Sequence, residues 1–321
     1  MSCYYPLSAY RSSELHEKTG NRKIVFSKED VGDRAYEKLE FACGQCTGCR
    51  LDRSKAWAVR CVHEASLYKR NCFITLTFND ENLHWSGSLI KEDFQKFMKR
   101  LRRHHKGHEP VVRDGKKTYP IRYFHCGEYG EKLGRPHHHA CLFNFCFEDL
   151  ELWKVDPNTG VKLYTSRTLH ERWEQRGHVT VGEVTMQSAA YVARYITKKV
   201  NGDRAEAHYT KYDPRTGEAW QIEPEYVTMS RRPGIGADWF KKYSEDVYPK
   251  DFVTHEGIKF QPPKYYDGLY EVDHEKELSV IKDKRRKHNV ETKLDNIGMR
   301  RKAKRVCQES RFKRLPRGSV K

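Results

Sequence analysis

The most regular alternation of hydrophobic and polar positions in this chain lies between residues 70 and 200. Residues 72–78, Cys-Phe-Ile-Thr-Leu-Thr-Phe, are β-branched and aromatic, and they predict a strand with Thr75 and Thr77 on one face. Residues 91–104 carry apolar side chains at helical spacing, which predicts an amphipathic helix. Its core stripe is expected to consist of Phe94, Phe97, Met98 and Leu101.

Three further strands and two further helices are predicted in the same region. The strands are expected at 121–128, 137–145 and 178–184, and the helices near 169–173 and at 188–200. The resulting order is strand, helix, strand, strand, helix, strand and a last helix. This order indicates an α+β fold of the split βαβ plan, which is a ferredoxin-like or RRM-like antiparallel sheet with helices on one face.

Outside this core the periodicity is weaker. Residues 1–40 predict an irregular arm with one short strand at 23–26, and residues 47–68 predict a helix. The basic residues of that helix, expected to face either DNA or solvent, are Arg50, Arg53, Lys55 and Arg60. We therefore divide the chain into a Cys-containing arm and helix (1–69), the core (70–200), a basic loop-rich extension (201–270) and a basic tail (271–321). The tail is expected to be helical in part, and either disordered or laid along DNA.

The charge balance points to a polyanionic partner. The 321 residues contain 61 Lys and Arg against 44 Asp and Glu, which gives a net charge of +17. This excess favours nucleic acid first and an anionic membrane surface second. No run of about 18 apolar residues is present to span a bilayer, and the N-terminal residues lack the apolar stretch of a secretory signal. We therefore expect a soluble, intracellular protein that does not act on membranes.

Ten cysteines in a long chain without a secretory signal predict reduced thiols or metal ligands rather than disulfides. Cys43, Cys46 and Cys49 are separated from one another by two residues, a spacing that suits tetrahedral zinc. The fourth ligand is expected to be either Cys3 or Cys61. Ordinary free thiols are the alternative to a structural zinc site, and an iron–sulfur cluster is less favoured.

The stretch 128–145 combines a carboxylate, turn-forming glycines and a run of three histidines. On a strand that begins at residue 137, alternate side chains share a face. One face would carry His137, His139, Cys141, Phe143 and Phe145. Two imidazoles with a carboxylate on the preceding strand form a half-open set of ligands for a divalent metal, with positions left for water and a phosphate. The alternative is a solvated pair of surface histidines.

Residues 191–199 read Tyr-Val-Ala-Arg-Tyr-Ile-Thr-Lys-Lys. On a helix, Tyr191, Tyr195 and Lys198 project together, while a separate apolar stripe can pack on the sheet. That stripe consists of Ala189, Val192 and Ile196. Beside a metal, a phenol can attack a DNA phosphorus and form a phosphotyrosine, and a lysine can offset the growing charge. The alternative is structural, because tyrosines often lie half-buried on helices with only the hydroxyl in water.

These stretches resemble the HUH endonuclease superfamily. Residues 73–78 are similar to its first motif, residues 135–139 (Arg-Pro-His-His-His) to its His-hydrophobe-His motif, and residues 191–199 to its tyrosine motif. The run at 43–50 (Cys-Gly-Gln-Cys-Thr-Gly-Cys-Arg) and the basic loop at 229–236 are similar to the replication initiators of gokushovirus-type single-stranded DNA bacteriophages.

The resemblance implies a role for each matching residue. The implied ligands of Mg²⁺ or Mn²⁺ are Glu128, His137 and His139. The implied catalytic residues are Tyr191, Tyr195 and Lys198. The implied DNA contacts are Arg135, Arg194, Lys199, Arg231 and Arg232. His138 stands where the superfamily has a bulky hydrophobe, so a shifted register with His138 as a ligand is the alternative.

The implied activity is rolling-circle replication of phage DNA. The protein would nick one strand at the origin, stay on the 5′ end and later rejoin the displaced strand. Its partners would be single-stranded and duplex origin DNA and the host polymerase and helicase, in the cytoplasm of the bacterial host. Two alternatives are a plasmid relaxase or transposase with the same chemistry, and a basic DNA-binding protein without catalysis.

Overall fold

The computed structural model describes residues 3–17, 20–31, 35–130, 132–157, 160–195, 199–200 and 202–314. It divides the chain into two compact units. Unit 1 comprises the described residues up to Arg53 and from Asp283 onward, and unit 2 comprises Ser54–Lys282.

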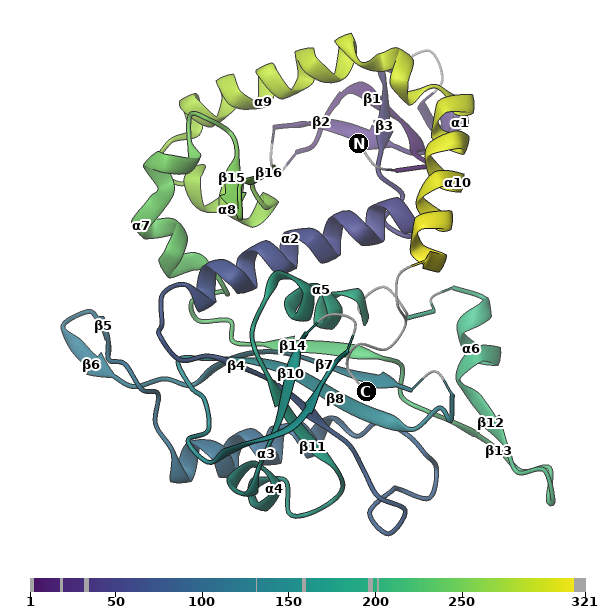
Figure 1. Ribbon diagram of the computed structural model, residues 1–321. Helices are drawn as coiled ribbons and strands as arrows, with labels where there is room; N and C mark the ends of the chain where they lie inside the picture. Colours follow the sequence, from purple (N-terminus) through teal and green to yellow (C-terminus); the bar gives the residue numbers. More distant parts are fainter. Residues whose placement is uncertain are drawn as a thin grey trace. The chain divides into compact units, whose positions relative to one another are not determined.

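Unit 2 is built on a seven-stranded sheet with the order β14-β7-β8-β4-β11-β10-β9 (Figure 1). Each neighbouring pair is antiparallel, which confirms the antiparallel α+β architecture expected from the sequence. The strands are β4 (Cys72–Leu76), β7 (Arg122–Tyr129), β8 (Pro136–Phe143), β9 (Leu150–Val155), β10 (Lys162–Ser166), β11 (Val179–Gly182) and β14 (Tyr226–Met229).

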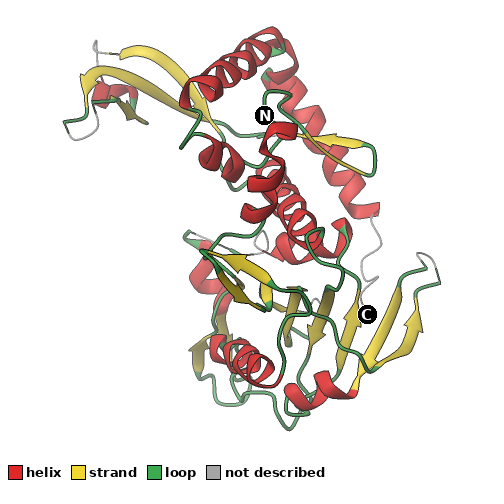
Figure 2. Ribbon diagram, turned by 90° about the vertical axis from the view of Figure 1, so that its left-hand side faces the viewer, coloured by secondary structure: helices red, strands yellow, loops and turns green. Residues whose placement is uncertain are grey.

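Helices cover both faces of this sheet, so the expectation of helices on one face alone was wrong. The helices that pack on it are α2 (Thr47–Ala65), α3 (Lys91–His104), α4 (Arg167–Arg172) and α5 (Met186–Tyr195). In Figure 1, α3 and α4 lie on one side of the sheet and α5 lies on the other, and Figure 2 also shows helices on both sides. The physical reason is that β4 is buried at every position, and a strand with two apolar faces needs cover on both.

Two apolar clusters reflect this division of the sheet. The first contains Ile74, Leu76, Ala140 and Leu142 and the predicted stripe of α3, Phe94, Phe97, Met98 and Leu101, all of which are buried. The second contains Phe73, Cys141 and Phe143 from the opposite face, packed with Ala58 and Cys61 of α2 and with Ala189 and Val192 of α5. The burial of Ala189 and Val192 agrees with the expected stripe, whose third member, Ile196, lies outside the described residues.

One residue of the predicted histidine strand lies on the other face. The strand β8 ends at Phe143, and Asn144 then adopts a left-handed backbone with φ of 61°. The alternation of side chains therefore stops, and Phe145 joins the cluster of α3 rather than the face of His139.

The rest of unit 2 forms a third apolar cluster and three small hairpins. The cluster joins α7 (Ala237–Val247), α8 (Lys264–Tyr270) and the buried Leu278 and Ile281 of α9 (Glu275–Glu291). The hairpins pair β5 (Val111–Arg113) with β6 (Lys116–Thr118), β12 (Thr210–Tyr212) with β13 (Ala219–Gln221), and β15 (Val253–His255) with β16 (Ile258–Phe260). The short helix α6 (Arg204–Tyr209) precedes β12.

Unit 1 contains more regular structure than the sequence predicted. Its strands β1 (Leu7–Leu15), β2 (Arg22–Val25) and β3 (Ala35–Phe41) form an antiparallel sheet, beside the short helix α1 (Lys28–Val31). The strand expected at 23–26 is confirmed as β2, whereas an irregular arm was the wrong prediction for the rest. The basic tail is helical, with α9 followed by a 3-10 turn (Lys293–Asn296) and α10 (Gly298–Arg314). None of the helices in the described part of the chain combines the length and hydrophobicity that crossing a bilayer requires.

Candidate active site

The strand register places the carboxylate and the two outer histidines on one face of the sheet. Glu128 of β7 lies opposite His137 of β8, and Thr75 of β4 lies opposite His139. Because side chains two positions apart on a strand share a face, His137 and His139 point the same way. Their rings lie nearly parallel, at 11° to each other, with centroids 6.4 Å apart.

His139 is fixed by hydrogen bonds from both ring nitrogens. Its Nε2 lies 2.7 Å from Glu128 Oε1, and its Nδ1 lies 3.0 Å from Thr75 Oγ1. A carboxylate only accepts, so Nε2 carries the proton here and Nδ1 accepts from the threonine hydroxyl. Both His139 and Glu128 are buried, which strengthens the contact between them.

His137 is oriented by the turn between β7 and β8. Its Nδ1 donates to the carbonyl oxygen of Arg135 at 2.7 Å, because that oxygen can only accept. The other nitrogen, Nε2, is then the one with the lone pair that a metal uses. A Cβ at Gly130 would lie 2.9 Å from the His137 ring, so the turn needs glycine there for the ring to keep its place. Burial, with the neighbouring His139, lowers the pKa of His137.

His138 lies on the opposite face and is fully buried in the core beside α3. Its Nδ1 is 3.2 Å from Nε2 of His125, and its own Nε2 has no hydrogen-bond partner among the described residues. Burial and the neighbouring histidines lower the pKa of His138 to about 3. The register therefore pairs His137 with His139, and His138 occupies the core position where the superfamily pattern has a hydrophobe.

The helix α5 brings Tyr191 to this face. Thr185 and Ser188 cap its start reciprocally, with Thr185 N donating to Ser188 Oγ at 2.8 Å and Ser188 N donating to Thr185 Oγ1 at 3.1 Å. The Tyr191 hydroxyl donates to Glu128 Oε1 at 3.3 Å, and its ring meets that of His139 edge-on, with centroids 5.1 Å apart. A nucleophile, a carboxylate and an imidazole therefore touch one another.

Two of the three predicted catalytic residues are not placed. The described backbone of α5 ends at Tyr195, whose side chain is outside the described part of the chain. Lys198 lies within 196–198, which is also outside it. Tyr191 is thus the predicted nucleophile whose position the structure gives.

The chemistry of the donor set fits a divalent cation. Two imidazole nitrogens and a carboxylate are a combination that Mn²⁺ and Mg²⁺ sites use. The three residues lie on one face, and Glu128 already contacts His139. Their donor atoms are nevertheless less tightly gathered than those of the four cysteines described below, which form the one described set of three or more ligand atoms within 4.8 Å of each other.

The predicted DNA contacts differ in their surroundings. Arg135 pairs with Asp80 and donates to the carbonyl of Phe78 at 2.9 Å, so it ties the start of β8 to the segment after β4. Arg194 is half-buried, and the exposed members of the set are Lys199, Arg231 and Arg232.

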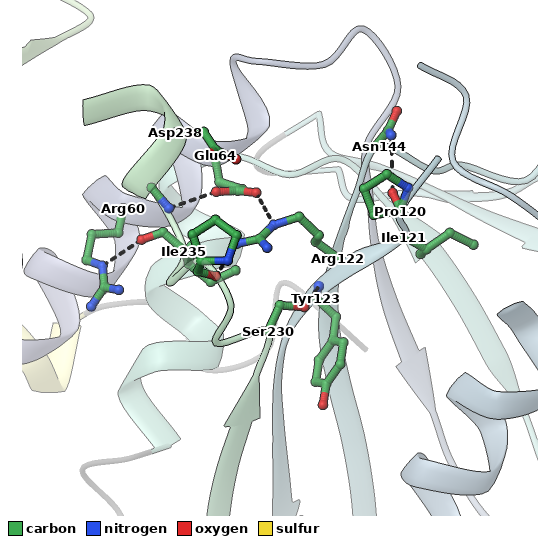
Figure 3. Close-up of polar contacts among 12 residues, drawn as sticks. Arg60, Glu64, Pro120, Ile121, Arg122, Tyr123, Asn144, Ser230, Ile235 and Asp238 are labelled. Atoms are coloured by element: carbon green, nitrogen blue, oxygen red, sulfur yellow. Dashed lines mark hydrogen bonds and ion pairs between the residues drawn. The ribbon is translucent and has the colours of Figure 1, made fainter. Parts of the chain in front are cut away.

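A buried network that the sequence did not reveal holds the basic loop at 229–236 (Figure 3). Arg122 Nε donates to Glu64 Oε1 at 2.5 Å, and Glu64 Oε2 accepts from Gly236 N at 2.7 Å. Arg122 Nη2 also donates to the carbonyl of Pro233 at 2.9 Å. Side chains of α2 and β7 therefore fix both ends of the turn that follows Arg231 and Arg232.

Arg60 belongs to the same network, so the expectation that it could face DNA was wrong. Its Nε donates to the carbonyl of Ile235 at 3.0 Å, and its guanidinium lies 3.9 Å from the ring centroids of both Trp57 and Tyr265. The loop approaches these rings closely, because a Cβ on Gly234 would lie 2.4 Å from the Tyr265 hydroxyl. Buried charges leave no periodic pattern, which explains why spacing alone did not identify them.

The cysteines predicted to bind zinc come together in unit 1. The sulfur atoms of Cys3, Cys43, Cys46 and Cys49 all lie within 4.8 Å of one another. Cys61, the alternative fourth ligand, is instead buried in the core of unit 2 beside Cys141. Of the two candidates for the fourth position, Cys3 is therefore the one beside the other three sulfurs.

Comparison with known proteins gives a consistent result. The model of a family of replication-associated proteins, the one described by the ORF2 protein, matches residues 71–200, which include Glu128, the histidine run and Tyr191. The chain is 35% identical to replication-associated protein ORF2 of Spiroplasma virus 4, over 89% of this chain and 86% of that protein. It is 32% identical to replication-associated protein VP4 of Bdellovibrio phage phiMH2K, over 85% and 78% of the two chains.

A third relative is more distant. Replication-associated protein ORF4 of Chlamydia phage 1 is 31% identical over 71% of this chain and 52% of its own length. No solved structure matches the chain.

Proposed function

Because the chain belongs to the family of phage replication-associated proteins, we propose that it initiates rolling-circle replication as an HUH-type endonuclease. The observation that carries this proposal is the contact between Tyr191, Glu128 and His139 on one face of the sheet. The central strand order β11-β4-β8-β7, with the chain order strand, helix, two strands, helix, strand, supports the ferredoxin-like plan of that superfamily.

Tyr191 supplies the nucleophile. A free phenol has a pKa near ~10 and is a weak nucleophile at neutral pH, so its proton must be taken as it reacts. Glu128 Oε1, at 3.3 Å, accepts the hydrogen bond from the phenol and is placed to receive that proton. The phenolic oxygen bonds to phosphorus, the bond from phosphorus to the 3′ oxygen breaks, and the proton ends on the departing 3′ oxygen. The products are a 5′-phosphotyrosine and a 3′ hydroxyl that primes a host polymerase.

His137, His139 and Glu128 would hold the cation, Mg²⁺ or Mn²⁺. When bound, it would supply Lewis-acid stabilisation of the negative charge on the phosphate oxygens. The protein's part is to orient the donors. Arg135 O fixes one imidazole through Nδ1, and Thr75 Oγ1 contacts the other through Nδ1, so both rings present Nε2 on the same face.

Tyr195 would perform the second strand transfer, because it stands four residues after Tyr191 on α5 and residues four apart share a helix face. Lys198 would offset charge on the phosphate. With both tyrosines, one strand end can be held while the other is accepted, and the ester keeps the bond energy needed for rejoining.

DNA binding follows from charge. The chain carries a net charge of +17, and Arg231 and Arg232 are exposed on the loop that the Arg122–Glu64 pair anchors. Phosphate contacts by such residues position the strand without reading its sequence. We propose single-stranded and duplex origin DNA as substrates, host polymerase and helicase as partners, and the bacterial cytoplasm as the place of action. The similarity to phage proteins favours this role over that of a plasmid relaxase or a transposase.

The proposal is tested by incubating the protein with the supercoiled replicative form of the phage and Mg²⁺. The expected product is a nicked circle that appears only in DNA carrying the phage origin and disappears in excess chelator. Tight binding without nicking, in Mg²⁺ and in Mn²⁺ alike, would instead identify a DNA-binding protein without catalysis.

A further inference from the structure

Four cysteine sulfurs from three separate stretches of unit 1 converge on one point. Cys3 precedes β1, Cys43 and Cys46 follow β3, and Cys49 lies in the first turn of α2. The Sγ atoms of Cys43 and Cys49 are 4.0 Å apart, as are those of Cys3 and Cys46, and all four lie within 4.8 Å of one another. Zinc binds cysteine sulfur at about 2.3 Å, so a tetrahedron of four ligands has edges of about 3.8 Å. The spacing of these sulfurs is close to that value.

Backbone amides are directed at the same sulfurs. Cys43 N donates to Cys3 Sγ at 3.3 Å, Cys46 N to Cys43 Sγ at 3.3 Å, and Tyr4 N to Cys46 Sγ at 3.4 Å. Hydrogen bonds to a sulfur favour its thiolate form, which is the form that binds metal. The loop thus provides both the ligands and the donors that stabilise their charge.

Unit 1 has little else to hold it together. Among its described residues, the buried hydrophobic side chains are Cys3, Ala9 and Cys49, two of which belong to the cluster itself. A small unit without a sizeable apolar core usually depends on cross-links, such as disulfides or a structural metal. The sulfur separations of 4.0 Å are about twice the length of an S–S bond, so no disulfide joins these cysteines here.

We propose that Cys3, Cys43, Cys46 and Cys49 bind one structural zinc ion. Four protein ligands complete a tetrahedral site and leave no open position, so this ion takes no part in strand cleavage. It cross-links the N-terminal segment, the turn after β3 and the start of α2. Arg53 Nη2, which donates to the carbonyl of Gly44 at 3.3 Å, adds a second tie between that turn and the helix. The site is separate from the Glu128 site and does not depend on the nuclease proposal.

The test is elemental analysis of the full chain, purified under reducing conditions from zinc-replete cells without chelator. One zinc per chain is expected, and it should be lost on Cys3→Ser or Cys46→Ser. Matched controls are Cys307→Ser, an exposed cysteine of α10, and Cys61→Ser, the other candidate for the fourth ligand; both should keep the zinc. Absence of zinc from the wild-type chain, iron in its place, or loss of zinc on Cys61→Ser with retention on Cys3→Ser would overturn the proposal.

A measurement on the unmutated chain guards against variants that fail to fold. Replacement of the metal by Co²⁺ should give the strong visible absorption of a tetrahedral tetrathiolate site and thiolate-to-metal charge transfer in the near ultraviolet. An octahedral Co²⁺ spectrum without charge transfer would contradict the assignment. Because adduct formation at Tyr191 is measured separately, loss of zinc binding and loss of nicking are distinguishable results.

Discussion

The hydroxyl of Tyr191 lies 3.3 Å from the carboxylate of Glu128, although 63 residues separate them along the chain. The contact exists because α5 packs on the face of the sheet that carries His139, with Ala189 and Val192 buried beneath the helix. It joins the predicted nucleophile to a predicted metal ligand. The predictions below follow from this arrangement and from the network that supports the basic loop.

The first prediction concerns which histidines bind metal. His139→Ala and His137→Ala should each lower metal-dependent nicking by at least roughly a hundredfold, because each removes a ligand. His138→Leu should keep nicking within about threefold, and its loss of the hydrogen bond to His125 should cost about 1 kcal/mol of stability. Nicking rates with Mg²⁺ titration provide the measurement. If His138→Leu abolished nicking while His137→Ala left it intact, the register would be shifted.

The second prediction concerns the buried ion pair beneath the basic loop. Arg122→Leu leaves the fully buried Glu64 carboxylate without its cation, which should lower the free energy of unfolding by about 3–5 kcal/mol. Arg167→Ala is the control, because it removes an exposed pair with Glu171 and should cost less than about 1 kcal/mol. Urea unfolding followed by fluorescence measures both. Equal costs for the two variants would show that the network contributes nothing special.

The third prediction concerns acid stability. Burial lowers the pKa of His63 to about 3, and its ring stacks on Trp239 with centroids 3.5 Å apart. Below a pKa of about 6.5 the unfolded chain binds a proton that the folded chain does not, so stability falls as pH falls. Between pH 7 and pH 5 this residue should account for about 2 kcal/mol of that loss.

Unfolding of His63→Leu at the two pH values tests this. The drop in stability on going from pH 7 to pH 5 should be smaller by about 2 kcal/mol than in the wild type, whatever the variant costs at pH 7. His288→Leu, in an exposed position of α9, should leave the drop as it is. An unchanged drop in His63→Leu would show that this histidine is not buried in its neutral form.

The fourth prediction concerns the exposed arginines of the basic loop. Arg231→Ala combined with Arg232→Ala should weaken binding to single-stranded DNA and reduce the salt dependence of the affinity by about 0.7 for each phosphate that the variant no longer neutralises. The fold should be unaffected, because both side chains are exposed. Binding isotherms at several salt concentrations give the slope. The same slope as the wild type would remove this loop from the DNA interface.

Strongly patterned segments were predictable from the sequence. The helix α3 and the strand β4 were found because each carries its apolar residues at a regular period. The face shared by His137 and His139 followed from alternation alone. The edge strand β9 was missed because five of its six residues are exposed, so it shows no buried face.

Other features depend on contacts between distant residues. The strand β1 buries mainly Ala9 and Ser12, which do not form a hydrophobic pattern. Arg60 read as a surface charge because sequence spacing carries no information about the rings of Trp57 and Tyr265 that enclose it. Spacing also left Cys3 and Cys61 equivalent as the fourth cysteine, and only the folded chain separates them.

The central claim is that Tyr191 forms a covalent bond with DNA beside Glu128, and mapping the adduct tests it most directly. A labelled single-stranded origin oligonucleotide is incubated with the full chain and Mg²⁺, and the SDS-resistant product is digested and analysed by mass spectrometry. The account predicts nucleotide on Tyr191, a loss of initial adduct of roughly a thousandfold in Tyr191→Phe, and normal adduct in the exposed control Tyr212→Phe. An adduct of undiminished yield in Tyr191→Phe, or one mapped outside α5, would contradict it.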